Sequence, residues 1–468
     1  MKKILVSLIG CFVAICAHAA QIVNVDYVHK LIAQKWDISV PIRADNPMQV
    51  ANMKYLLTAI DVANEILNGE KTTDYGNGEF ATLQVADTTA TNQAVETLIK
   101  KEIEYEFFLT TTSTNSFSFS ISAAGEFIVN WGDGKTETIT KPDTTNTTYS
   151  HTYNTSKSYT IKLTGQATAY NTDKYNAAIS FYVGSSPHAK ETNVKKIASI
   201  DGSLGAIFGT LSSDTNNQPR FWMTFYNATN MTGSIPSDLF AGISGAPASN
   251  MFDFTFSGCS GLTGAIPDGL FAGISGTPAS YMFNNTFNGC SGLTGAIPDG
   301  LFGNLTGAPA ESMFSGTFSG CSGLTGAIPS DLFAGISGAP AEWMFADTFS
   351  GCSGLTGAIP DGLFAGISGA SASYMFYGTF ADCSGLTSIP ENLFGNISDS
   401  WWDNFFGSTF YNCTSLTGPS ARINGQYLYE IWPDVFTYYN GYGAYYGCTG
   451  LSDYSTMPSP WRSYNVDD

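Results

Sequence analysis

Basic side chains are scarce in this 468-residue chain, and they almost vanish from its second half. Only 13% of all residues are charged, and residues 201–468 contain three arginines (Arg220, Arg422 and Arg462) against twenty acidic residues. A surface with this balance repels polyanions. We therefore expect no nucleic acid and no anionic membrane among the partners of the second half.

Histidine is also rare, and the usual catalytic motifs are missing. Beyond residue 20 the histidines are His29, His151 and His188, and no Gly-x-Ser-x-Gly, His-Glu-x-x-His or phosphate-loop motif accompanies them. We predict a protein that is not an enzyme, with no catalytic residue, no cofactor and no metal. Two alternatives stay open: an exported hydrolase that acts on glycans and is targeted by a binding module, and a purely structural envelope protein.

Long apolar runs are absent after the N-terminus. Lys2 and Lys3 precede an apolar stretch at 4–17 and the small-residue pattern Ala17-His18-Ala19. This order predicts a signal peptide at 1–20, export to the cell surface or exterior, and no membrane insertion once it is removed. The sequence Leu8-Ile9-Gly10-Cys11 leaves a lipoprotein signal as the alternative.

Removing that segment leaves seven cysteines, an odd number that cannot pair fully within one chain. Six of them follow one another at intervals of 31, 31, 31, 31 and 30 residues, which predicts a ladder of buried reduced thiols: Cys259, Cys290, Cys321, Cys352, Cys383 and Cys413. Disulfides between coils or a metal site are the alternatives, but stacked identical residues suit disulfide geometry poorly.

A long phrase returns around each cysteine, as in TFSGCSGLTGAIPDGLFAGISG at 255–276 and again at 348–369. Self-similarity at this period predicts stacked coils that bury a common core. For the coil 262–290 we expect a short strand at 262–266, a turn through 268–271, and a short helical piece that carries Met282, Phe283 and Phe287.

The order Phe, Cys three residues later and Leu three after that resembles the BspA-like bacterial leucine-rich repeat over about 224–451. The resemblance implies an α/β leucine-rich-repeat solenoid with a parallel sheet in a cell-surface or secreted protein. It also implies adhesion, through binding a protein or glycan of a host or neighbouring cell. The 31-residue period and the recurring Gly-Ala-Ile-Pro depart from the usual pattern.

The flanking regions complete a multidomain prediction. Residues 21–102 are expected to be mostly helical, 185–223 to be a linker and N-terminal cap, 224–418 to be the repeats, and 419–468 to be an aromatic-rich C-terminal cap. Alternating residues at 103–184 predict a small all-β sandwich. There, Trp131-Gly132-Asp133-Gly134 and the later His151-Thr152-Tyr153 resemble an immunoglobulin-like PKD domain. Asp133 is expected to shape a turn and His151 to form a core hydrogen bond.

Positions that vary between copies are the candidate ligand contacts, because an exposed surface can change while the scaffold is fixed. They are Asn250, Tyr281, Ser312, Trp343, Tyr374, Asn284, Asp347 and Tyr377. Neutral drift on a solvated face would give the same pattern. An acidic ladder after each Ile-Pro could bind calcium or simply face water: Asp238, Asp268, Asp299, Asp331, Asp361 and Glu391. The oligomeric state is not indicated.

Overall fold

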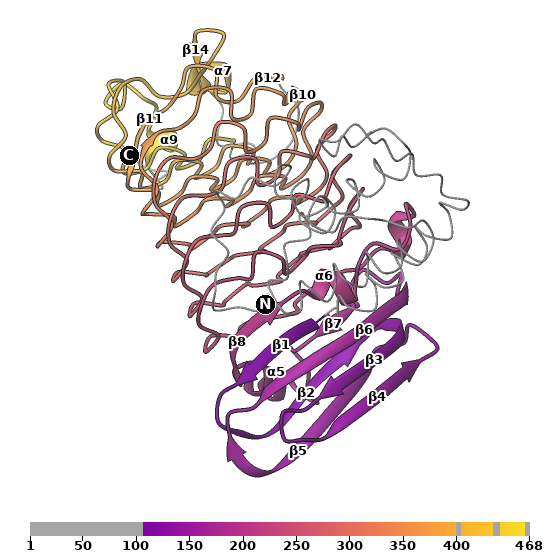
Figure 1. Cartoon of the computed structure of the whole chain (residues 1–468). Helices are drawn as coiled ribbons and strands as arrows, with labels where there is room; N and C mark the ends of the chain where they lie inside the picture. The colour runs from indigo at the N-terminus through magenta and orange to yellow at the C-terminus, as the bar shows by residue number, and fades with distance from the viewer. Residues whose placement is uncertain (1–105, 399–403, 434–439, 464–468) are drawn as a thin grey trace, which may run out of the picture. The chain divides into compact units, whose positions relative to one another are not determined.

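The computed structural model describes residues 106–398, 404–433 and 440–463 (Figure 1). All of them belong to one compact unit that begins at Tyr105. The predicted signal peptide and the predicted helical region at 21–102 lie outside the described residues.

The unit begins with two antiparallel sheets. The first has five strands in the order β4-β3-β6-β1-β8, and the second has three in the order β5-β2-β7. The strands are β1 (Glu106–Thr111), β2 (Thr114–Ile121), β3 (Ala123–Asn130), β4 (Thr136–Lys141), β5 (Thr147–Lys157), β6 (Thr160–Tyr170), β7 (Ile179–Ser180) and β8 (Ile197–Gly202).

Apolar residues at alternate positions bury one face of each sheet. In β2, Phe117, Phe119 and Ile121 are buried, and they face residues of the other sheet such as Phe107 and Trp131. The Phe119 and Trp131 rings lie 5.5 Å apart. Period-2 alternation is the pattern of a strand with one buried face, and strands form where the alternation predicts them.

The segment that connects the sheets to the repeats forms hydrogen bonds with both regions. It contains α5 (Pro187–Val194), β8, α6 (Leu204–Ile207) and the 3₁₀ turn η1 (Thr215–Asn217). β8 pairs with β1, and the Thr232 amide of the first coil donates to the Ala198 carbonyl at 2.8 Å. The Phe181 ring, just after β7, stacks on Phe225 of the first coil at 5.3 Å. The sheets and the coils therefore share one continuous hydrophobic core.

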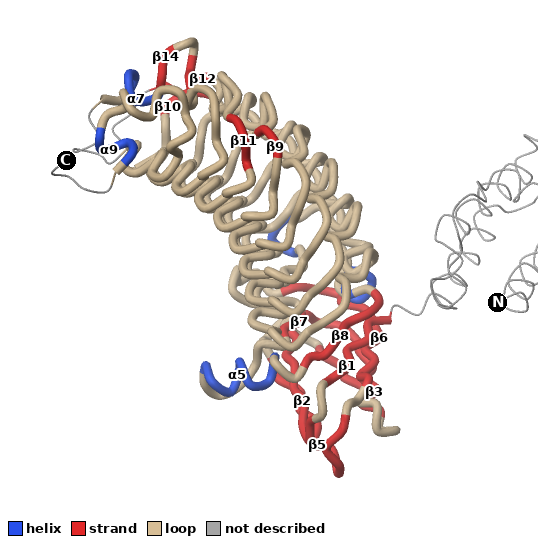
Figure 2. The backbone as a smooth tube through the Cα atoms, turned by 90° about the vertical axis from the view of Figure 1, so that its left-hand side faces the viewer, coloured by secondary structure: helices blue, strands red, loops and turns tan. Residues whose placement is uncertain are grey.

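Each repeat forms a coil made almost entirely of turns, which Figure 2 draws as loop. From 281 to 290 the backbone amides alternate in their partners. The odd-numbered residues donate to carbonyls of the next coil, as Phe283 does to Met313 at 3.0 Å, and the even-numbered residues donate to the carbonyl three residues back. Every fourth residue, at 281, 285 and 289, has a positive φ. We call this segment the turn ladder.

The predicted leucine-rich-repeat solenoid with a parallel sheet is wrong. Across the described residues, parallel pairing in the repeats consists of isolated single bridges and two short two-stranded pairs. The pairs are β9 (Gly357–Ala358) with β11 (Leu386–Ser388) and β10 (Ser368–Ala370) with β12 (Asn396–Ser398). Gly264, with φ +80°, breaks the strand expected at 262–266 after one bridge. The left-handed residues of the turn ladder likewise prevent the expected helical piece at 282–287.

The interior of the coils is built from stacked identical residues. One ladder of phenylalanines has ring centroids 5.4–5.8 Å apart and nearly parallel planes: Phe252, Phe283, Phe314, Phe345, Phe376 and Phe406. Neighbouring coils also approach closely, because a Cβ added to Gly323 would lie 2.4 Å from the Leu293 carbonyl oxygen. The glycine of the Cys-Ser-Gly-Leu phrase is thus required by contact between coils.

Aromatic residues close the last coils. This end contains β13 (Arg422–Ile423), β14 (Gln426–Tyr427), α7 (Leu428–Ile431) and α9 (Ser459–Arg462). Trp461 is fully buried, and its ring lies against Gly441. The Asp453 carboxylate is buried with it and accepts hydrogen bonds from Ser420 and Tyr429. These contacts bury apolar side chains at the end of the last described coils.

Candidate binding site

One variable position recurs once per coil and always has a left-handed backbone. We call it the variable column; its members have φ between 51° and 60°: Asn250, Tyr281, Ser312, Trp343, Tyr374 and Asn404. Their amides continue the pairing between coils, as Trp343 does with the Ser373 carbonyl at 3.0 Å. A residue with a Cβ pays about 1–2 kcal/mol for this conformation, and asparagine tolerates it best. Tryptophan and tyrosine are therefore unexpected here.

Three of the predicted contact residues come together as an aromatic cluster, which we define as Trp343, Tyr374 and Tyr377. The Trp343 and Tyr374 rings stack with centroids 4.0 Å apart and an interplanar angle of 7°. Tyr377 stands edge-on to both, at 6.4 Å from Trp343 and 5.7 Å from Tyr374. Trp343 is 36% exposed and both tyrosines are partly exposed. The cluster thus presents part of three aromatic side chains to solvent, although the Trp343 and Tyr374 rings cover one face of each other.

A fourth predicted residue, Asp347, borders this cluster. Its amide donates to the Tyr377 carbonyl at 2.7 Å, and its carboxylate lies against Gly378. Burial raises the pKa of Asp347 to about 6. Glu342, next to Trp343, is exposed.

Tyr281 has a different environment, because a lysine from the sheet region covers it. The Lys174 Nζ atom lies 5.8 Å from the Tyr281 ring centroid and 5.1 Å from that of Tyr175. The Tyr281 hydroxyl donates to the Glu311 carboxylate. Tyr175 is 53% exposed, and its ring contacts Trp222 edge-on at 5.5 Å.

The remaining predicted contacts, Asn250, Ser312 and Asn284, are buried rather than exposed. The two asparagines bind the buried Asp253: Asn250 Nδ2 donates to Oδ2 at 2.7 Å, and Asn284 Nδ2 donates to Oδ1 at 2.8 Å. Burial raises the pKa of Asp253 to about 6, while these bonds and Lys174 oppose the rise. Asn250 Oδ1 is buried without a hydrogen-bond partner. These amides form an internal network, which explains their variation without a ligand.

Sequence reasoning missed Lys174 and the buried network around Asp253. Lys174 lies in the sheet region, more than a hundred residues before Tyr281, and no local pattern links them. Asp253 is visible in the sequence as a position that varies between copies, because its equivalents in the next two coils are Asn284 and Ser315, but the sequence does not show that it is buried.

The cysteines occupy the core of the coils. All seven described cysteines are buried and unpaired, and burial raises the pKa of each thiol. Each donates to a phenylalanine carbonyl of the preceding coil, as Cys321 Sγ does to Phe287 at 3.0 Å. The predicted ladder residues thus serve as buried rungs at the same place in successive coils, and Cys448 extends the series.

The acidic ladder faces solvent. All six of its residues are exposed: Asp238, Asp268, Asp299, Asp331, Asp361 and Glu391. Within the described ranges, no group of three or more His, Cys, Asp or Glu side chains is placed to hold a metal ion.

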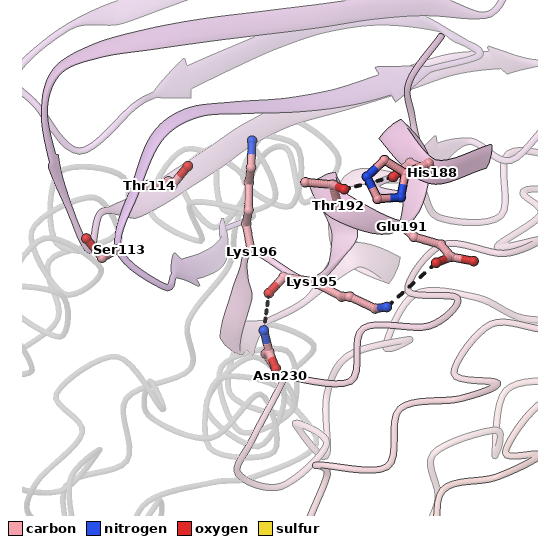
Figure 3. A pocket seen from close by; sticks show the side chains of 8 residues that line it. All are labelled: Ser113, Thr114, His188, Glu191, Thr192, Lys195, Lys196 and Asn230. Carbon is pink, nitrogen blue, oxygen red and sulfur yellow. Dashed lines mark hydrogen bonds and ion pairs between the residues drawn. The ribbon is translucent and has the colours of Figure 1, made fainter. Parts of the chain in front are cut away.

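Two further polar regions lie near the sheets. A pocket of about 370 Å³ lies between the β1–β2 turn and α5 (Figure 3). Its polar contacts stabilise the backbone around it: Asn230 Nδ2 donates to the Lys195 carbonyl at 2.7 Å, and Lys195 pairs with Glu191 at 3.6 Å. Lys196 Nζ donates to the Ser116 carbonyl at 2.9 Å and to the Ser116 hydroxyl at 3.1 Å, which ties the residue before β8 to β2.

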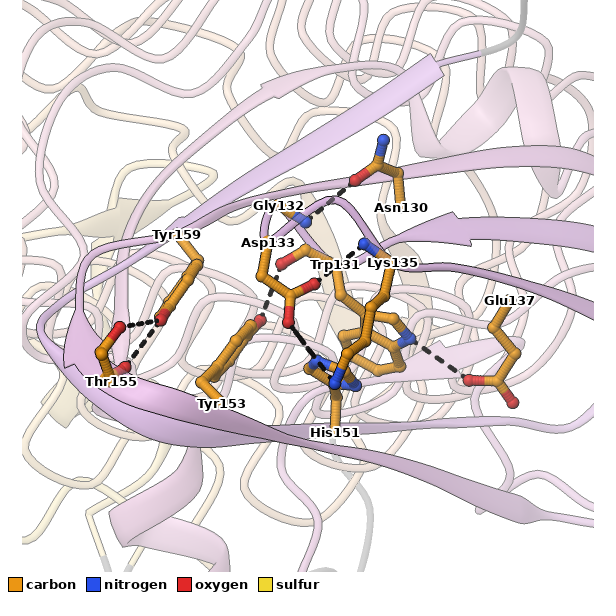
Figure 4. A network of polar contacts seen from close by, with 10 residues as sticks. All are labelled: Asn130, Trp131, Gly132, Asp133, Lys135, Glu137, His151, Tyr153, Thr155 and Tyr159. Carbon is orange, nitrogen blue, oxygen red and sulfur yellow. Dashed lines mark hydrogen bonds and ion pairs between the residues drawn. The ribbon is translucent and has the colours of Figure 1, made fainter.

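The second region is the Trp-Gly-Asp-Gly turn after β3 (Figure 4). Asp133 Oδ1 accepts the Lys135 amide and Oδ2 contacts His151 Nε2 at 2.9 Å. Burial opposes ionisation, but these bonds hold the pKa of Asp133 below its usual value. The His151 ring stacks on Trp131 at 4.9 Å. Asp133 and His151 therefore perform the structural roles expected of them.

None of the helices described is long and apolar enough to cross a bilayer. No protein-family model matches this chain, and no curated protein or solved structure is significantly similar to it.

Proposed function

We propose that this chain is an exported, non-catalytic recognition protein that mediates adhesion by binding a protein or glycan of another cell. The observation that carries the proposal is the aromatic cluster, two parallel rings and one edge-on ring at the surface of a scaffold that is otherwise repeated. Exposed tryptophan and tyrosine are the residues most enriched in binding hot spots.

The scaffold does not require these rings. The variable column accepts Ser312 between Tyr281 and Trp343 with the same left-handed backbone. Trp343 and Tyr374 also bear the cost of that conformation, which an asparagine, as at the equivalent Asn250 and Asn404, would reduce. Their stacking offsets part of the cost, because an aromatic pair contributes about 0.5–1.5 kcal/mol beyond its buried area.

The N-terminal pattern of charge and hydrophobicity supports export, and the likeness of the repeat phrase to the BspA-like surface proteins supports adhesion. The acidic balance of residues 201–468 is compatible with a soluble exterior protein.

The test is to change Trp343 and Tyr374 to serine together and to screen the full chain on arrays of host proteins and glycans. We expect ligand capture to fall at least tenfold, since hot-spot truncations cost about 2 kcal/mol or more. Folding should be kept, because the neighbouring coil carries serine at this position.

The matched control changes Tyr411 and Tyr446 to serine. These tyrosines also stack at the surface, with centroids 5.0 Å apart, but they lie outside the variable column. Capture that survives the first double substitution unchanged would show that the aromatic cluster is not the contact surface.

A further inference from the structure

We propose that the aromatic cluster recognises cationic side chains, so that the partner presents a segment rich in lysine or arginine. This inference rests on the proposed function and deepens it by naming the chemistry of the ligand. It is drawn from a contact that the chain makes within itself, from the charges around the cluster and from the geometry of the rings.

The internal contact is that of Lys174 with Tyr281. Tyr281 belongs to the same variable column as Trp343 and Tyr374, and the Lys174 ammonium group lies over its ring at 5.8 Å. This distance is within the range in which a cation is attracted to the negative face of an aromatic ring. Asp253 and Glu311 supply negative charge at the same place. The column therefore already binds one lysine, delivered by the loop after β6.

The later coils keep aromatic residues in the column but lack the lysine. Trp343 and Tyr374 stand two and three coils beyond Tyr281. The exposed Glu342 adjoins Trp343 in the sequence, and the Asp347 amide donates to the Tyr377 carbonyl at 2.7 Å. From 221 to 421 the sequence contains no lysine or arginine at all. Among the described residues, no cation lies over Trp343, Tyr374 or Tyr377. An external cation would find rings and carboxylates with no basic competitor nearby.

The ring geometry also suits a cation. Tryptophan binds cations better than tyrosine or phenylalanine does, and Trp343 is the most exposed member of the column. Tyr377 meets the stacked pair at 63° and 69°, so the three rings form a corner rather than a flat platform. A flat platform is what a sugar ring would need, whereas a corner can contact an ammonium or guanidinium group from two sides. The geometry and the acidic surroundings favour a basic protein segment over a neutral glycan.

The experiment titrates the full chain with decalysine and follows binding by isothermal titration calorimetry at about physiological ionic strength, near 0.15 M. Calorimetry detects binding equally in a variant that lacks Trp343. Decalysine with acetylated side chains is the matched ligand, because it keeps the length and loses the charge. We expect decalysine to bind and the acetylated peptide to bind at least tenfold more weakly. The Trp343→Ser/Tyr374→Ser variant should lose about fivefold or more, the size of one or two cation–ring contacts.

The Asp347→Asn variant tests the contribution of the carboxylate charge, because asparagine has nearly the same shape as aspartate and no charge. Asparagine tolerates the left-handed backbone at this position, so the fold should be kept while decalysine binding falls about threefold to fivefold. The Tyr411→Ser/Tyr446→Ser control should bind as the wild type does. The inference is overturned if decalysine binds all four proteins equally, which would reflect net charge alone.

A second outcome would also overturn it while leaving the proposed function intact. In that case a neutral glycan or the acetylated peptide would bind, and the Trp343→Ser/Tyr374→Ser substitution would abolish that binding. If no member of the protein and glycan arrays bound through these rings, the proposed function itself would fail.

Discussion

Among single residues, Asp253 has an unusual environment, since its carboxylate is 3% exposed and surrounded by amides. Burial raises its pKa to about 6, whereas an aspartate in the unfolded chain titrates near 4. The folded state therefore binds more protons than the unfolded state between these values, and stability falls as the pH rises from about 4 to about 6. Above about pH 6 the destabilisation is complete.

Asp253→Asn should consequently stabilise the protein at neutral pH, on the order of 1–3 kcal/mol. When the Asn250 amide turns over, its Oδ1, which now lacks a partner, can accept from the new amide in place of the bond that its Nδ2 now donates to Asp253. Thermal unfolding measured between pH 4 and pH 8 checks this: the gain should be largest above pH 6 and should shrink towards pH 4. Asp268→Asn, at an exposed position, should change stability by less than about 0.5 kcal/mol at any pH. A gain independent of pH would show that ionisation of Asp253 is not the cause.

The core residues of the coils are also the part of the structure that the sequence predicts best at this scale. Met282, Phe283, Phe287 and Cys290 are all buried, as the repeat indicates. Exposure at the variable positions is predicted less well. Asn250 and Ser312 are buried while Trp343 is exposed, although all three share one backbone position. Side-chain size explains this difference in exposure, because asparagine and serine are short enough to be covered by the turn whereas tryptophan extends beyond it.

At the level of elements, the turn ladder takes the place of the expected strands and helices. Its amides alternate between the next coil and the preceding turn, so the backbone is satisfied without either regular element. The sequence contains hints of this in Gly258, Gly289 and Gly320, all with positive φ. Tyrosine and tryptophan at equivalent left-handed positions give no such hint, because those residues rarely adopt that conformation. For this reason the sequence predicts the length of the repeat correctly but predicts its secondary structure wrongly.

Threonine hydroxyls in the turn ladder of each coil form hydrogen bonds with the preceding coil. Thr317 Oγ1 lies 2.9 Å from the Phe283 carbonyl oxygen and 2.8 Å from that of Phe314, and equivalent threonines repeat the contact. Thr317→Val keeps the shape and removes the donor, so we expect a loss of about 1–2 kcal/mol. Denaturant unfolding measures it. Thr325→Val, at an exposed threonine of the same coil, is the control and should have almost no effect; equal losses would argue against the hydroxyl contact.

At the scale of the whole described unit, the sheets and the coils share one hydrophobic core. Phe181 stacks on Phe107 at 5.9 Å and on Phe225 at 5.3 Å, joining the two regions through a single ring. The predicted boundary at 184 and 185 falls between segments that share this core. Separate fragments cut there would each expose apolar surface that is now buried.

Phe181→Ala should therefore destabilise both regions together, by about 3–4 kcal/mol. Hydrogen exchange resolved along the chain would detect it as faster exchange in β1 to β7 and also in the first coils around 221–256. Ile128→Ala, at a side chain that is 45% exposed, serves as the comparison and should leave exchange nearly unchanged. Loss of protection confined to the sheets would mean that the coils fold independently.

The close similarity of successive coils has a genetic consequence. Because each 31-residue copy meets its neighbours through the same phenylalanine, threonine and cysteine contacts, gaining or losing a whole copy leaves every junction equivalent. Unequal recombination between copies could then lengthen or shorten the molecule in single layers. A copy gained or lost between Lys174 and Trp343 would change the distance between these two residues. The contacts between neighbouring coils would stay the same.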